Sequence, residues 1–356
     1  MSHTNLSQSW GKAVELVDCE YCKWRYLLSA EKQPDDCPHC YRAALSLGQS
    51  PEANSLSKVK KLFLNFTVTP QTLSERILDF ARRIPFAPTD LVAENLQTRL
   101  QALYLPLWLV DSQVQAVWEA ETGFNYDILS HKDEYHENTG WNSEEITKTR
   151  IQWEKRLGAL IRTHNEISTS ALQKPEELKA LFEAYDLSKK QRYTPQAIAS
   201  ALVYLPTRPQ NEAWLDVVPI IEETSSKECQ QAASADHIRN FAWQPTFHNQ
   251  QWTLLLLPVY ASYYLDDQQQ RQPLLLHGQS GLISGKRRAS MQRAKRYSLL
   301  IVTIAIAIAL FSLLAFMLST AAAVLDAAMI GVYAALVVGV LALLPLLIVW
   351  YFNRTH

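Results

Sequence analysis

Two long apolar runs near the C-terminus constrain this chain more than any other feature. Residues 297–318 and 327–352 contain no Asp, Glu, Lys, Arg or His. A helix of 22 residues is about 33 Å long, enough to cross a hydrocarbon core of ~30 Å. A soluble helix of that length would keep a polar face, and neither run has one. We therefore predict a transmembrane hairpin with spans at residues 297–318 and 329–352, joined by a short link that holds Asp326.

Basic residues gather at the outer ends of this hairpin. Arg354 follows the second span, and the link has no basic residue. Six precede the first span: Lys286, Arg287, Arg288, Arg293, Lys295 and Arg296. Because basic residues stay on the cytoplasmic side, both termini are predicted to be cytoplasmic. The run is either an ordinary stop-transfer flank or an added contact with anionic lipid, at about 1 kcal/mol per basic residue.

The rest of the chain has the composition of a soluble protein, at roughly 290 residues in one or two units. Its first residues are polar, so no secretory signal peptide is predicted. The formal net charge is −1, and nothing global indicates a nucleic-acid partner.

Four of the five cysteines form two CxxC pairs, Cys19/Cys22 and Cys37/Cys40, separated by fourteen residues. In a cytoplasmic protein such pairs indicate metal binding rather than disulfides. Four thiolates make a closed tetrahedral site, so we predict one structural Zn²⁺ in a ribbon over residues 1–47. His39 is either a spare ligand or a surface residue.

The residues of the predicted ribbon do not by themselves decide between a protein and a nucleic-acid partner. Acidic and basic residues are balanced around it, whereas a nucleic-acid surface should carry a positive excess. Trp24 and Tyr26 could stack on bases or pack the ribbon core. We favour a protein partner, with a membrane-tethered nucleic-acid binder as the alternative.

A linker at residues 48–57 is predicted to precede an α+β body over residues 58–285. Two similar blocks, Tyr104-Leu-Pro-Leu-Trp108 and Leu257-Pro-Val-Tyr260, suggest a duplication into β-hairpin units at about 58–168 and 169–285. The expected strands are 62–68, 103–118, 157–167, 254–265 and 274–277, with a hairpin or loop at 127–155. The expected helices are 70–81 with a capping box at Thr72 and Glu75, 89–103, 175–186, one from Thr194, and 210–240.

No motif of nucleophilic, metal-dependent or nucleotide-dependent catalysis is apparent. Gly281-x-x-x-Gly285-Lys286 has three residues between its glycines where a phosphate loop needs four, and Arg287 stands at the magnesium-ligand position. We interpret this segment as a final hairpin and the protein as a non-enzyme.

Small residues recur every four positions in the second span, at Gly331, Ala335 and Gly339. Such a stripe permits close helix contact. It serves either the packing of the hairpin on itself or homo-oligomerisation. A channel or transporter is disfavoured, because the spans lack ionisable residues.

Taken in order, these motifs resemble a bacterial family of membrane-anchored, transcription-factor-IIB-type zinc-ribbon proteins. The segments that carry the resemblance are the four cysteines, Tyr104-Leu-Pro-Leu-Trp108 and His277-Gly-Gln-Ser-Gly281 ahead of the spans. Members are sometimes labelled primosomal or helicase-like, but this chain has no helicase motif. We therefore expect an inner-membrane scaffold whose ribbon projects on its linker and recruits a protein partner. The resemblance implies that this partner belongs to a membrane-stress or SPFH-type assembly.

Overall fold

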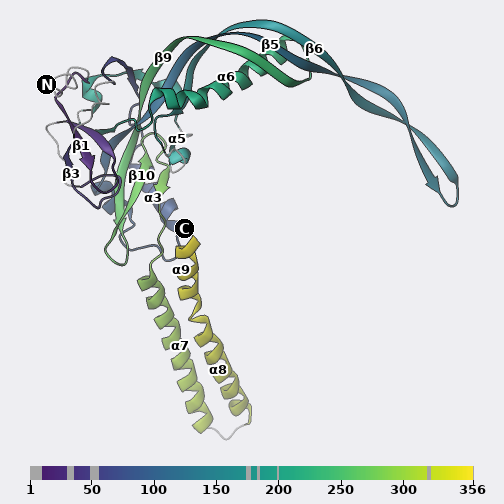
Figure 1. The fold of residues 1–356 in the computed structure, drawn as a ribbon. Helices are drawn as coiled ribbons and strands as arrows, with labels where there is room; N and C mark the ends of the chain where they lie inside the picture. Colours follow the sequence, from purple (N-terminus) through teal and green to yellow (C-terminus); the bar gives the residue numbers. More distant parts are fainter. Residues whose placement is uncertain are drawn as a thin grey trace. The chain divides into compact units, whose positions relative to one another are not determined.

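The computed structural model describes residues 10–29, 36–48, 56–173, 178–182, 185–198, 200–318 and 322–355 (Figure 1). The chain forms two compact units, each assembled from separate stretches. Unit 1 contains residues 1–106, 174–205 and 256–356, and unit 2 contains residues 107–173 and 206–255. The predicted domain boundaries at residues 57, 168 and 285 assume that each domain is one continuous stretch of chain, and they stay predictions.

The N-terminal ribbon is part of the unit 1 sheet. Strands β1 (Val14–Cys19), β2 (Arg25–Ser29) and β3 (Leu45–Leu47) pair antiparallel in the order β3–β1–β2. Strand β2 also pairs with β8 (Leu202–Tyr204), with Tyr26 opposite Tyr204. The expectation that the ribbon projects on its linker is therefore wrong, because a backbone ladder joins it to the body. Most of that linker lies outside the described residues.

The sheet continues from the ribbon through β8 to the body. The unit 1 end of β5 (Gln101–His136) pairs parallel with β8, at Leu103 and Tyr104. The strand order then runs β5, β9 (His237–Leu265), β10 (Arg271–His277) and β11 (Ile283–Gly285). Short strands β4 (Lys60–Phe63) and β7 (Gln191–Arg192) pair with each other beside this path. The final hairpin predicted at residues 280–286 is present as β10–β11.

Helix α3 (Pro70–Arg82) begins where the sequence predicts, but its cap differs. The N-cap residue is Thr69 and not Thr72. The Thr69 side chain accepts a hydrogen bond from the Thr72 backbone N–H, at 3.2 Å. Leu73, Ile77 and Phe80 face the unit 1 core, as their helical spacing indicates.

The helix predicted over residues 89–103 is wrong in length, since α4 spans only Ala93–Thr98. The Asp90 carboxylate accepts hydrogen bonds from Arg99 and from the Leu265 backbone, which fixes the preceding residues in a loop. Residues 101–103 belong to β5 instead.

Three further helical segments are shorter than predicted. The one expected at 175–186 is α5 (Lys179–Phe182), and its predicted start lies outside the described residues. The one expected from Thr194 is a single 3-10 turn, Pro195–Ile198. Helix α6 (Gln210–Ala232) continues through Pro219. It ends before the predicted residue 240, because β9 begins at residue 237.

Unit 2 is a long antiparallel hairpin with one helix packed on it. Strand β5 pairs with β6 (Gly140–Ser170) in one register from Ser112 to His136. This confirms the predicted hairpin at 127–155 and extends its strands in both directions. Val217 and Ile221 of α6 pack on Val110, Val114 and Ala116 of β5. The proposed duplication of β-hairpin units stays a prediction.

His277 closes the turn between β10 and β11. Its ring is fully buried and stacks on Tyr185 at 3.7 Å between centroids, and its Nδ1 accepts hydrogen bonds from the Gln279 and Ser280 backbones. Burial lowers the pKa of His277 from 6.5 to about 4, so the folded protein holds the neutral ring.

We expect His277 to make the protein sensitive to mild acid. Its contribution is present above the unfolded pKa of 6.5 and is lost as the pH falls toward 4. Between pH 7 and pH 5 the loss should reach roughly 2 kcal/mol, less any relaxation of the site. In His277→Asn the amide oxygen can accept the same two N–H groups, so this part of the pH dependence should disappear. Thermal unfolding at pH 7 and pH 5 measures it, and equal slopes in both proteins would refute it.

The C-terminal helices are long and apolar enough to cross a membrane. Helix α7 spans Met291–Leu318, while α8 (Ala322–Leu341) and α9 (Leu344–Thr355) continue one another next to Pro345 (Figure 1). Large apolar side chains such as Phe311, 75% exposed, point away from the rest of the chain. Asp326 lies in the first turns of α8 rather than in a link, so that prediction is wrong.

A seam of small residues spaced by seven joins α7 to the returning helices. The seam residues are all buried: Ser298, Ala305 and Ser312 on α7, Ala328 and Ala335 on α8, Ala342 in the turn after α8, and Val349 on α9. A seven-residue repeat keeps one face of each helix toward its partner. At the body end, the Asn353 side chain bonds both backbone groups of Ala289, at 2.8 and 3.0 Å.

Candidate metal centre

The two CxxC pairs form knuckles with the same backbone geometry. In each, the N–H four residues after the first cysteine bonds back to its carbonyl: Lys23 to Cys19 at 2.9 Å, and Tyr41 to Cys37 at 2.8 Å. Lys23 and Tyr41 have φ of 61° and 51°, the left-handed conformation that glycine adopts most easily. These are the positions after the second cysteine of each pair.

The knuckles bring all four sulfurs to one point. Cys19 and Cys40 Sγ are 3.6 Å apart, as are Cys22 and Cys37 Sγ, and all four lie within 4.8 Å of one another. Zn–S bonds of about 2.3 Å in a tetrahedron give sulfurs about 3.8 Å apart. The cluster could therefore hold one metal ion, and its donor set fits zinc.

The surroundings of the sulfurs favour ionisation of Cys37 but not of Cys22 or Cys40. The contact with Cys22 lowers the pKa of the Cys37 thiol to about 5, aided by the Tyr26 hydroxyl, which lies 3.4 Å from Cys37 Sγ. The same contact raises the pKa of the Cys22 thiol. Burial raises the pKa of the Cys40 thiol to about 11, so its ionisation requires a cation nearby.

Aromatic rings stack next to the cysteine knuckles. The Trp24 ring stacks on His39 at 3.7 Å and on Tyr204 at 3.8 Å between centroids. His39 is therefore a packed side chain and not one of the four grouped ligands. Tyr26 is fully buried. No sequence pattern indicates Tyr204, because its contact with Trp24 depends on the pairing of β2 with β8.

Cys229 lies apart from this cluster. It is buried on α6 in unit 2, and burial raises the pKa of its thiol. It is not one of the grouped ligands.

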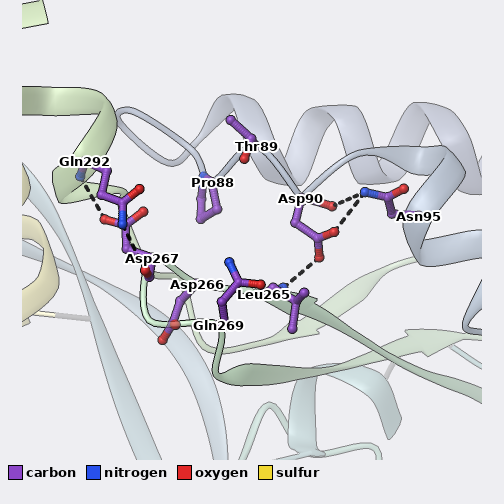
Figure 2. Close-up of a pocket in the computed structure, with 9 residues that line it drawn as sticks. All are labelled: Pro88, Thr89, Asp90, Asn95, Leu265, Asp266, Asp267, Gln269 and Gln292. Carbon is purple, nitrogen blue, oxygen red and sulfur yellow. Dashed lines mark hydrogen bonds between the residues drawn. The ribbon is translucent and has the colours of Figure 1, made fainter. Parts of the chain in front are cut away.

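A polar cavity of about 280 Å³ lies beside the start of α7 (Figure 2). Its three carboxylates are held by groups of the protein. Asp90 accepts from Asn95, Arg99 and the Leu265 N–H; Asp266 caps the β9–β10 turn. Asp267 accepts from Ser290 and the Gln292 N–H at the first turn of α7. These bonds account for the acidic cluster as a structural feature.

The predicted membrane-flank residues occupy the approach to α7 and its first turns. Three of them make side-chain contacts: Arg287 lies over the Phe80 ring, Arg288 donates to the Asn353 carbonyl, and Arg293 donates to the Ala87 carbonyl. Among the described residues, none of the six forms an ion pair. Within the described part of the chain, no carboxylate therefore pairs with the positive charge at this end of the helix.

The predicted small-residue stripe divides between two faces. A Cβ added at Gly331 would lie 2.0 Å from Ser312 Oγ, and Ala335 is buried in the seam. A Cβ at Gly339 would meet nothing within 4 Å. Gly331 and Ala335 therefore face α7, and Gly339 does not.

No protein-family model, curated protein or solved structure matches the chain. The resemblance to membrane-anchored zinc-ribbon proteins stays a prediction.

Proposed function

We propose that this protein is a non-enzymatic, membrane-anchored adaptor that recruits a protein partner to the cytoplasmic face of the bacterial inner membrane. Helices α7, α8 and α9 would supply the anchor, and the basic flank with Arg354 supports a cytoplasmic position for both termini. One structural zinc on the four cysteines holds the ribbon as part of the unit 1 sheet.

The observation that carries this proposal is a set of exposed apolar side chains on one face of the β5–β6 hairpin, which also carries Glu119, Asp127 and Glu145. Residues opposite each other in an antiparallel pair, and those two apart along a strand, share one face. The apolar members of this open face are Val117, Leu129, Tyr135, Trp141, Ile151, Leu157 and Ile161, all 40–78% exposed. The opposite face carries Val114 and Ala116, which pack on α6.

Exposed apolar side chains that contact one another, as they do at the hairpin tip, are typical of a binding surface. Near the hairpin tip, Tyr135 and Trp141 face each other with ring centroids 5.4 Å apart, and Leu129 continues the same face. Residues 126–150 hold six acidic and three basic side chains. This charge balance disfavours nucleic acid and suits a protein partner.

The ribbon also supports a protein over a nucleic acid. Both faces of Trp24 are covered by rings, and Tyr26 is buried, so neither can stack on a base. The nucleic-acid alternative would have to use Lys23 and Arg25 alone. A partner in a membrane-stress or SPFH-type assembly follows only from the family resemblance.

The open face can be tested by site-specific photocrosslinking in intact cells. A photoreactive amino acid at Trp141 should give one discrete protein adduct. The same photoreactive residue at Glu144 should give little adduct. Glu144 pairs with Lys132, and the even-numbered residues of this pair of strands lie on the face opposite to Trp141. Equal adducts from both positions, or none from Trp141, would contradict the proposal.

A further inference from the structure

A second cavity, of about 450 Å³, lies beside the first turns of α7. Its lining residues are Thr89, Arg293, Arg296, Tyr297 and Leu300. The four α7 residues are spaced three, four and seven apart, so they form one face of the helix. This face changes from charged to apolar in the direction of the membrane-spanning run.

The wall opposite α7 is fixed by direct contacts. The Phe86 and Tyr297 rings lie 5.4 Å apart between centroids, and the Phe86 carbonyl accepts a hydrogen bond from the Ser290 N–H at 2.8 Å. Arg293 Nη1 donates to the Ala87 carbonyl at 2.6 Å. The cavity is thus held open between a fixed loop and a helix.

The cavity has positive charge and no acidic lining residue. One of the five N–H donors of Arg293 is used by Ala87. Among the described residues, neither Arg293 nor Arg296 forms an ion pair. The carboxylates of the neighbouring cavity, which shares Thr89, accept hydrogen bonds from other groups of the protein.

We propose that this cavity binds the phosphate of an anionic phospholipid from the cytoplasmic leaflet. Arg293 and Arg296 would donate to the phosphate oxygens, forming charge-assisted hydrogen bonds. Tyr297 and Leu300 would contact the glycerol and the first acyl carbons, as aromatic residues do at membrane interfaces. The mixed lining favours an amphipathic ligand over a free phosphate ion. The site is additional to the adaptor function and independent of any protein partner.

The test uses the full-length protein purified in mild detergent and incubated with phosphatidylglycerol. Native mass spectrometry then counts bound lipid on wild type, Arg296→Gln and Lys295→Gln. Lys295→Gln is a matched control, because it removes the same charge one residue away from a position outside the lining. Arg296→Gln should lower lipid retention about tenfold, the effect of losing charge-assisted bonds, and Lys295→Gln less than twofold.

Two further measurements separate the lipid from other anions and from misfolding. Phosphatidylcholine should be retained less than phosphatidylglycerol, and millimolar inorganic phosphate should not displace the lipid. Arg296 is exposed, so its substitution should leave the unfolding temperature unchanged. Equal loss in Arg296→Gln and Lys295→Gln, or displacement by phosphate, would overturn the proposal.

Discussion

Replacing Cys37 and Cys40 together by serine should remove the one equivalent of zinc that we propose for the four cysteines. Two ligands cannot hold the ion that four thiolates hold, and structural zinc contributes about 10–16 kcal/mol to the folding of small zinc domains. Since a protein of this kind is stable by only about 5–15 kcal/mol, the ribbon should unfold. Metal content by elemental analysis gives the first readout.

Loss of the metal should also destabilise the part of the body that pairs with the ribbon. Strand β2 pairs with β8, and Trp24 stacks on Tyr204, so unfolding of the ribbon removes partners from the body. We expect faster hydrogen exchange at Leu202–Tyr204 in the double variant. Cys229→Ser is the control, because Cys229 lies outside the cluster, and it should keep one zinc. Unchanged zinc in the double variant would show that the assignment is wrong.

Substituting leucine for Gly331 should disrupt the transmembrane hairpin. The added Cβ would lie 2.0 Å from Ser312 Oγ and 3.0 Å from Ser312 Cβ, so α7 and α8 would have to separate. Overpacking of this kind costs roughly 1–3 kcal/mol. Unfolding of the full-length protein by increasing SDS in mild detergent would measure the loss.

Gly339→Leu provides both a control and a discrimination between the two uses of the stripe. A Cβ at Gly339 meets nothing within 4 Å, so the hairpin should tolerate leucine there. If the face that carries Gly339 joins copies of the chain, Gly339→Leu should instead weaken an oligomer detected by crosslinking. A stable Gly331→Leu together with an unstable Gly339→Leu would contradict the observed packing.

The parts of the fold that sequence predicts well are those set by local spacing. The cysteine pairs determine their own knuckles, and apolar length alone predicts α7 and α8. The left-handed Lys23 and Tyr41 could not be inferred from residue type, since neither is glycine. Their position after each pair is the only signal.

The failures occur where distant residues decide the structure. The backbone pairing of the ribbon with the body uses strand Leu202–Tyr204, whose three residues are too few to show a periodic pattern. The helix expected over 89–103 is shortened because Asp90 binds Leu265, far away in sequence. Likewise, Asn353 carries no sequence signal for its contact with Ala289.

The most direct test of the adaptor is to identify what co-purifies with the intact chain from its native membrane, with and without nuclease. Wild type should retain one protein at fixed ratio after nuclease treatment. Leu129→Ser with Trp141→Ser should lose it while keeping zinc and thermal stability, since both side chains are more than 70% exposed. Nucleic acid retained in place of a protein, or a partner bound equally by this variant, would contradict the account.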